Sequence, residues 1–195
     1  MKIYLIRHGE TTGDIENRYG GDYDDHLSAT GKVQCEGLVQ KLKNKNIEII
    51  YHSPRIRAKE TAEILNKSLK VNIEPVTDLR ERNNYGVLTG LVKTEAKAKH
   101  PEEVKKLEKD KLHHKVSGSE DYKPFKERVI SAFQKLISGK HDVVAIISHG
   151  GPISCIFREF GFGEFESLGD CAIIEIENVN AKLQLVKTEN AVLRK

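Results

Sequence analysis

Two short apolar segments end in the same way, and they constrain the fold more than any other feature of the chain. Residues 2–6 (Lys-Ile-Tyr-Leu-Ile) precede Arg7-His8-Gly9-Glu10, and residues 143–147 (Val-Val-Ala-Ile-Ile) precede Ser148-His149-Gly150-Gly151. Runs of this length and composition are typical of buried strands. If the two strands are parallel neighbours, their carboxyl ends meet at one edge of a sheet, where open α/β folds place ligands. The sequence therefore predicts a pocket that holds two imidazoles.

Strand-like and helix-like segments alternate along the rest of the chain. We expect further strands at 47–51, 71–75, 171–176 and 183–186, and helices at 28–43, 53–69, 101–112, 122–137 and 152–160. Ser28 and Ser53 are the predicted helix caps, the second followed by Pro54 at the first helical position. A polar turn at residues 178–180 predicts a hairpin between the last two strands. The order indicates an α/β three-layer sandwich, with a mostly parallel sheet of about six strands, an antiparallel edge, and helices on both faces.

Length and composition narrow the class of protein. The 195 residues contain no Pro/Gly/Ser-rich linker, which favours one domain over 1–195, with residues about 83–120 as a lid-like insertion. Apolar runs are too short to span a bilayer or to form a signal peptide, so neither a membrane protein nor a secreted one is expected. Three widely spaced cysteines suggest reduced, buried thiols in a cytoplasmic protein. A net charge of +3 gives no argument for nucleic acid.

The residues after the first strand indicate an anion. Arg7 is a permanent cation, and a cation beside the His8 imidazole is unfavourable unless an anion lies between them. Phosphate is the obvious candidate. A single histidine of this kind is more often structural, but the second imidazole at His149 favours a functional pair.

Several spaced motifs occur in the order that is found in a known family. The chain resembles the histidine phosphatase superfamily, the phosphoglycerate-mutase-like proteins, from Lys2 to about Leu185. The resemblance rests on these segments: Arg7-His8-Gly9-Glu10-Thr11; Arg18, Gly21, Asp24, Leu27, Gly31 and Gln34; Ser53-Pro54-Arg55-Ile56-Arg57-Ala58-Lys59-Glu60-Thr61-Ala62; Leu79-Arg80-Glu81, Gly86 and Gly90; Glu120, Arg128 and Val129; Ser148-His149-Gly150-Gly151.

The resemblance implies a role for each member of the predicted site. His8 would be the nucleophile that accepts the phosphoryl group, with Glu81 as the proton donor and His149 as a further catalytic group. Phosphoryl oxygens would be bound by Arg7, Arg57 and the backbone N–H of Gly150. From the residues alone, Glu81 could instead pair with Arg80 or Arg82 at the surface, Asp78 is a weaker alternative acid, and Arg55 reads as a surface residue.

Two positions depart from the family pattern, and two others are open. Asp14 stands where the family commonly has a phosphate-binding asparagine, and Gly13 replaces the usual tryptophan. Asp14 could turn away from the phosphate, pair with Arg18, or meet a cation of the substrate. Arg18 matches a phosphate-binding arginine at the pocket rim. Glu120 matches a substrate-rim position, but it is also placed to be a neighbour of a helix N-cap.

The resemblance predicts a metal-independent phosphomonoesterase that acts through a phosphohistidine. Alternatives are a phosphoglycerate-type mutase and a catalytically silent phosphate-recognition module. The mutase is disfavoured because the segment 94–118 is compact and offers His113-His114 but no arginine pair. Histidines and carboxylates lack metal-ligand spacing such as His-Glu-x-x-His, so no metal or cofactor is expected. The expected partner is a small phosphorylated metabolite, not nucleic acid or a membrane; a homodimer is left open.

Overall fold

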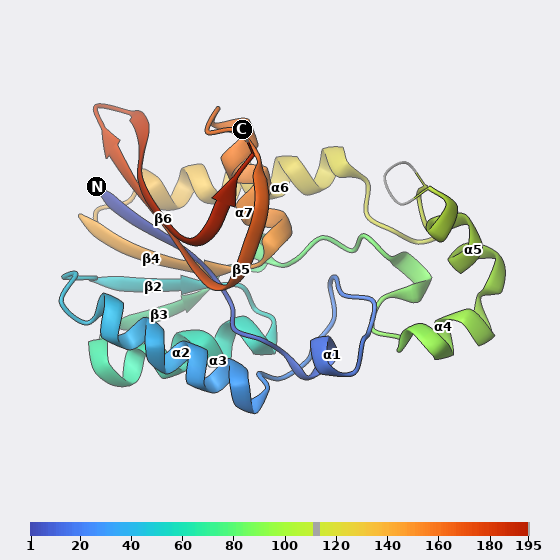
Figure 1. The fold of residues 1–195 in the computed structure, drawn as a ribbon. Helices are drawn as coiled ribbons and strands as arrows, with labels where there is room; N and C mark the ends of the chain where they lie inside the picture. The colour runs from blue at the N-terminus through green and yellow to red at the C-terminus, as the bar shows by residue number, and fades with distance from the viewer. Residues whose placement is uncertain (111–113, 195) are drawn as a thin grey trace.

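The computed structural model describes residues 1–110 and 114–194, which form a six-stranded sheet between layers of helices (Figure 1). The strands are β1 (Lys2–Arg7), β2 (Ile49–His52), β3 (Asn72–Pro75), β4 (Val143–Ser148), β5 (Phe165–Val179) and β6 (Lys182–Leu193), in the spatial order β3-β2-β4-β1-β5-β6. The first four strands are parallel, β5 pairs antiparallel with β1, and β6 pairs antiparallel with β5. The predicted sheet with an antiparallel edge is confirmed.

The helices cover both faces of the sheet, as predicted. On one face lie α2 (Ala29–Leu42) and α3 (Ile56–Leu69), and on the other lie α6 (Tyr122–Ile137) and α7 (Gly150–Glu159) (Figure 1). Successive residues of β1 alternate between the two layers. Ile3 and Leu5 pack with α6 and α7, whereas Tyr4 and Ile6 pack with α2 and α3, and all four are essentially inaccessible to solvent. Each buried aliphatic side chain stabilises the fold by roughly 1.5–3 kcal/mol.

The segment predicted as a lid-like insertion has an apolar cluster of its own. It contains η2 (Gly86–Leu88), α4 (Lys93–Lys99) and α5 (Pro101–Lys109). Their cluster includes Tyr19 from the loop that follows β1, together with Leu88, Ala96, Val104, Leu107 and Val116. The helix α4 was not predicted. The predicted helix 101–112 ends at Lys109, while Leu112 and His113 lie outside the described residues.

Several predicted boundaries are wrong. Helix α3 begins at Ile56 with Arg55 as its N-cap, two residues later than predicted. A short helix α1 (Thr12–Ile15) that was not predicted lies between β1 and α2. The last two strands are longer than expected, and their turn lies at Asn180 and Ala181, both with positive φ, rather than at 178–180. Ser28 caps α2 as predicted, by accepting a hydrogen bond from the N–H of Gly31.

None of the helices in the described ranges has the length and apolar character needed to cross a membrane.

Candidate active site

The register of β1 and β4 brings the two predicted histidines together. Arg7 pairs with Ser148 across these parallel strands, and the N–H of His8 donates to the Ser148 carbonyl at 3.1 Å. The imidazoles of His8 and His149 follow directly, with ring centroids 5.0 Å apart. Both side chains are buried. The predicted pocket with two imidazoles therefore exists at the carboxyl edge of the sheet.

The His8 ring is held in one tautomer. Its Nδ1–H donates to the Gly9 carbonyl at 2.8 Å, and its Nε2 accepts from Arg57 Nε at 3.2 Å. Burial, followed by the charges of Arg57 and Arg7, holds the pKa of His8 well below its ordinary value. The ring is therefore neutral, and the lone pair on Nε2 faces the site.

Gly9 lies where the loop after β1 closely approaches α2. A Cβ at this position would lie 2.7 Å from the Gly31 carbonyl oxygen. The close contact of the loop with α2 therefore requires glycine here.

Arg57 lies in the first turn of α3 and is fixed by the loop that follows α1. Its Nη1 donates to the Tyr23 carbonyl and to Asp25, both at 2.7 Å, and its Nη2 donates to the Gly21 carbonyl at 3.0 Å. The Arg57–Asp25 ion pair is about 95% buried on both sides. These bonds orient the guanidinium so that its Nε points at the two imidazoles.

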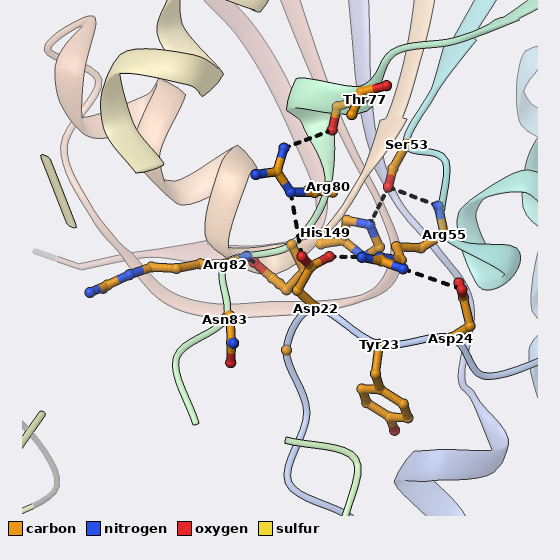
Figure 2. Close-up of polar contacts among 12 residues, drawn as sticks. Asp22, Tyr23, Asp24, Ser53, Arg55, Thr77, Arg80, Arg82, Asn83 and His149 are labelled. Carbon is orange, nitrogen blue, oxygen red and sulfur yellow. Dashed lines mark hydrogen bonds and ion pairs between the residues drawn. The ribbon is translucent and has the colours of Figure 1, made fainter. Parts of the chain in front are cut away.

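His149 is the N-cap residue of α7 and bridges two groups. Its Nδ1 accepts from Arg57 Nε at 3.2 Å. Its Nε2–H donates to Ser53 Oγ at 2.7 Å (Figure 2). Burial, followed by the charges of Arg57 and His8, lowers its pKa well below the ordinary value. Ser53, which the sequence suggested as a helix cap, orients this imidazole, and its Oγ also accepts from the Arg55 N–H at 3.3 Å.

Glu81 faces the same cavity from the segment after η1 (Thr77–Leu79). Its Oε1 accepts from the Arg82 N–H at 2.8 Å and its Oε2 from the Gly151 N–H at 3.1 Å. Burial raises the pKa of Glu81 above its ordinary value, and this outweighs the opposing effect of those bonds and of Arg57 and Arg7. A buried carboxyl with a raised pKa is suited to carry a proton.

The alternative in which Glu81 pairs with Arg80 or Arg82 side chains is wrong. The Arg80 guanidinium contacts Asp22, Asp78 and Glu120, and the Arg82 guanidinium donates to the Glu120 carbonyl.

A clamp of Arg128 and Glu120 holds the segment that carries Glu81. Arg128 Nη1 donates to the carbonyls of Asp78 and Arg80, and its Nη2 donates to the carbonyl of Glu81. The same guanidinium forms a bidentate pair with Glu120, with Nε and Nη2 at 2.8 and 2.9 Å from the carboxylate oxygens. Glu120 thus faces Arg128 and does not line the cavity, and its substrate-rim role stays a prediction.

An outer ion-pair network orders the loop that holds Arg57 (Figure 2). Asp22 accepts from Arg55 Nε at 2.6 Å and lies 3.4 Å from Arg80 Nε. Asp24 accepts from Arg55 Nη1 at 3.2 Å and from the backbone N–H of Ile56 at 3.1 Å. Arg55 was expected to be a plain surface residue, but only 24% of its side chain is exposed. It ties the start of α3 to this loop.

The site encloses a cavity of about 110 Å³, enough for one phosphoryl group or several waters. Its lining contains Arg7, His8, Thr11, Gly13, Asp14, Arg18, Gly20, Gly21, Tyr23, Asp25, Arg57 and Glu81. His149 lies behind it, in contact with Arg57.

Arg7 lines this cavity and has one buried donor without a partner among the described residues. Its Nη1 donates to the Leu168 carbonyl at 2.5 Å and its Nη2 pairs with Asp170 at 3.2 Å. Its buried Nε has no hydrogen-bond partner among the residues that the structure describes. A buried donor without a partner is unfavourable, so an acceptor in the cavity would stabilise it.

Asp14 and Arg18 line the cavity but are engaged elsewhere. Asp14 Oδ2 accepts from the Thr11 N–H at 2.9 Å and from its hydroxyl at 2.8 Å, which forms a capping box at the start of α1. Arg18 Nε pairs with Glu16 at 2.5 Å, and its Nη1 donates to the Gly90 carbonyl at 2.6 Å. No hydrogen bond or ion pair joins Asp14 to Arg18 within residues 1–110 and 114–194. Their phosphate-binding roles remain predictions.

Tyr23 is a lining residue that the sequence did not identify. A Cβ at Gly13 would lie 1.9 Å from the Tyr23 hydroxyl oxygen, so the tyrosine fills the space beside this glycine. The hydroxyl donates to Asp25 at 3.1 Å, and the Arg57 guanidinium lies 5.7 Å from the ring centroid. Gly13 in place of the family's usual tryptophan was a sign in the sequence that this space is filled differently.

A second cavity of about 340 Å³ adjoins the first and shares Arg18 and Gly20 with it. Its other lining residues are Tyr19, Tyr85, Lys93, Leu107 and Glu108. Most of them come from the insertion 83–120. The residues 1–110 and 114–194 contain no group of three or more His, Cys, Asp or Glu side chains placed to hold a metal ion.

Comparison with known proteins agrees with this geometry. A family model described as "Histidine phosphatase superfamily (branch 1)" matches residues 3–190. Phosphoglycerate mutase-like protein 4 of Arabidopsis thaliana is 32% identical over 162 residues, which cover 80% of this chain and 70% of the relative. A metal-independent phosphoserine phosphatase of the same plant is 30% identical over 161 residues, covering 80% and 67%.

The solved structures include a putative alpha-ribazole-5'-P phosphatase from Escherichia coli strain K-12. It superposes with a TM-score of 0.82 at 22% identity, over 100% of this chain and 99% of that one. At this identity the likeness shows the fold. The match over residues 3–190 and the related sequences together show that the chain belongs to the histidine phosphatase superfamily, branch 1.

Proposed function

We propose that the protein is a phosphomonoesterase that works through a covalent intermediate on Nε2 of His8. The observation that carries the proposal is the neutral His8 ring. Its Nδ1 is held by the Gly9 carbonyl, and its Nε2 lies in a small cavity lined by Arg7, Arg57 and Glu81. An unprotonated imidazole nitrogen beside two guanidinium groups is the arrangement that transfer of an anionic phosphoryl group requires.

In the first step, the Nε2 lone pair attacks phosphorus, the P–N bond forms and the ester P–O bond breaks. Glu81 gives its proton to the leaving alkoxide oxygen. In the second step, the ionised Glu81 removes a proton from water, the water oxygen attacks phosphorus and the P–N bond breaks. Inorganic phosphate leaves, and Glu81 and His8 regain their starting states.

The cations supply the electrostatic part of catalysis. The unpartnered Nε–H of Arg7 and the N–H of Gly150 at the start of α7 donate to phosphoryl oxygens. Arg57 Nε, which points at both imidazoles, also faces the transferring group. His149 is neutral in the empty cavity, and a phosphate dianion would raise its pKa, so that it becomes a further donor. Because these groups provide the positive charge, we propose that no metal ion is needed.

The substrate we propose is a small phosphorylated metabolite. Its leaving group would extend past Arg18 and Gly20 into the adjoining cavity between Tyr85 and Lys93. The names of relatives favour hydrolysis, since one is a metal-independent phosphoserine phosphatase. A mutase must exclude water and bind a second phosphate. We favour the phosphatase because the lining of the adjoining cavity includes a carboxylate, Glu108, in addition to its two cations. The presence of both histidines and of Glu81 argues against a silent recognition module.

Phosphate release from a panel of phosphomonoesters, with a metal chelator present, tests this proposal. Wild type should release phosphate and His8→Ala should not. A substitution of the exposed His26, such as His26→Ala, is a matched control that keeps the site intact and should leave the activity unchanged. Activity that survives in His8→Ala, or that the chelator abolishes, would contradict the mechanism.

A further inference from the structure

Two cysteines that are far apart in the sequence lie in contact directly beneath the His8 loop. Cys35 of α2 and Cys171 of β5 are both buried, and their sulfur atoms are 3.8 Å apart. The third cysteine, Cys155 of α7, is also buried, but its thiol contacts the Tyr122 hydroxyl. The chain therefore contains one thiol pair and one separate thiol.

The thiol pair is joined to the backbone on both sides of the nucleophile. The N–H of Cys171 donates to the His8 carbonyl at 3.1 Å. The Cys35 thiol donates to Thr61 Oγ1 at 3.5 Å, and the same oxygen accepts from the Gly9 N–H at 3.4 Å. Gly9 in turn supplies the carbonyl that fixes the tautomer of His8. A change in the distance between the two sulfurs is therefore transmitted to the group that we propose as the nucleophile.

The two thiols differ in acidity. A hydrogen bond from Cys171 lowers the pKa of Cys35 below its ordinary value, although burial opposes this. The same contact with Cys35, together with burial, raises the pKa of Cys171. Cys35 is thus the better thiolate and Cys171 the thiol that is placed to meet it.

We propose that Cys35 and Cys171 form an oxidation site, which a small hydroperoxide converts to a disulfide and which thereby switches off the His8 site. The Cys35 thiolate attacks one peroxide oxygen, so that an S–O bond forms and the O–O bond breaks, leaving Cys35 as a sulfenic acid and releasing water or an alcohol. Cys171 then attacks the Cys35 sulfur, the S–S bond forms and the S–O bond breaks. The hydroxide that leaves takes up the Cys171 proton. The peroxide is reduced by two electrons, and the two thiols are oxidised.

The expected effect follows from the geometry. A disulfide requires the sulfurs to be about 2.05 Å apart, so they must approach by about 1.8 Å from their present contact. Movement of α2 or β5 by part of this distance shifts Gly9 and the His8 carbonyl. Misplacement of a reacting group by about 1 Å typically lowers a rate by about 10²-fold. Formation of the disulfide does not depend on the proposed function, whereas the expected loss of phosphatase activity rests on it.

The test uses the full-length reduced protein, treated with hydrogen peroxide and then freed of it. Intact mass and non-reducing peptide mapping should show the loss of two hydrogen atoms and a link between the peptides that carry Cys35 and Cys171. The rate kcat on the best phosphomonoester should fall about 10²-fold and return with dithiothreitol. The ¹⁵N resonances of the His8 imidazole should shift on oxidation, and this readout does not depend on turnover.

Three variants complete the experiment. Cys155→Ser should respond to peroxide as wild type does. Cys35→Ala and Cys171→Ser should form no link and should keep their activity through peroxide treatment. Two separate variants are used because one of them could fail to fold. The absence of the link, or a link that involves Cys155, would overturn the oxidation site. A link that leaves kcat and the His8 resonances unchanged would overturn the switch. If wild type lacks phosphatase activity, only the proposed function fails. The intact mass and the His8 resonances still decide whether the oxidation site exists and whether it changes the His8 site.

Discussion

Replacing Gly151 with alanine displaces the proposed proton donor without changing its chemistry. Gly151 lies in the first turn of α7, and its N–H donates to Glu81 Oε2 at 3.1 Å. An alanine Cβ there would lie 2.2 Å from Glu81 Oε1, whereas ordinary contact begins at 3.4 Å. The carboxylate must therefore move by about 1.2 Å, the difference between these two distances. Alanine favours a helix over glycine by up to about 1 kcal/mol, so the helix itself is not weakened.

The size of the kinetic effect follows from this displacement. A shift of about 1 Å costs roughly 10²-fold, within the 10²–10⁴-fold that a positioned acid contributes. In Gly151→Ala, we expect the single-turnover release of an alkyl alcohol, which needs a proton, to slow about 10²-fold. This corresponds to an increase of about 2.7 kcal/mol in the activation free energy. Release of a nitrophenolate, which leaves without a proton, should slow by less than about tenfold. Single-turnover kinetics isolate this first step from the hydrolysis that follows it.

A matched control is available on the surface. Gly37 lies in the exposed part of α2, where an added Cβ meets nothing within 4 Å, so Gly37→Ala should leave both rates unchanged. Urea unfolding of both variants checks that the folds are intact. Equal losses for the alkyl and the nitrophenyl substrate, or an unchanged alkyl rate in Gly151→Ala, would refute Glu81 as the acid.

Three further predictions concern stability and substrate affinity. The pKa values of His8 and His149 lie below 6.5 in the folded state, so the unfolded chain binds more protons than the folded one as the pH falls. These two groups should therefore leave the free energy of unfolding constant above pH 6.5 and lower it as the pH drops below 6.5. Urea titrations at a series of pH values measure this, and His149→Gln should show a smaller slope. Arg128→Met removes the bidentate partner of Glu120 and the donor to three carbonyls. It should lower the free energy of unfolding by about 3 kcal/mol as well as kcat, whereas an unchanged urea midpoint would contradict the clamp. Asp14→Asn removes a negative charge from the cavity lining and should tighten inhibition by inorganic phosphate about fivefold, for roughly 1 kcal/mol, whereas weaker inhibition would contradict the unfavourable role of this charge.

The features that the sequence predicted correctly are those encoded by local patterns. The alternation of apolar runs with amphipathic segments predicted the sheet and its two helical layers, because each strand needs cover on both faces. The two His-Gly pairs predicted the cavity, because parallel neighbours end at the same edge of a sheet. The capping role of Ser28 was equally local, since its partner is three residues away.

The features that could not be predicted depend on partners distant in the sequence. Ser53 resembles a helix cap when only its neighbours are considered, but its partner His149 lies 96 residues away. The contact between Arg128 and the Glu81 carbonyl could not be predicted, because it depends on how α6 packs. Tyr23 reaches the cavity through the path of a loop whose conformation is set by ion pairs with α3. Such choices depend on strand register and loop path, which no local pattern contains.

The covalent intermediate on His8 is the central claim, and trapping it is the most direct measurement. Wild type should be mixed with a radiolabelled phosphomonoester, quenched within milliseconds in alkali, where phosphohistidine survives, and digested for peptide mapping. The account predicts that the label is on Nε2 of His8. The amount of labelled His8 should rise in Gly151→Ala if the displaced Glu81 slows hydrolysis of the intermediate more than it slows its formation. Label on another residue, or turnover with no labelled peptide while His8→Ala remains active, would contradict it.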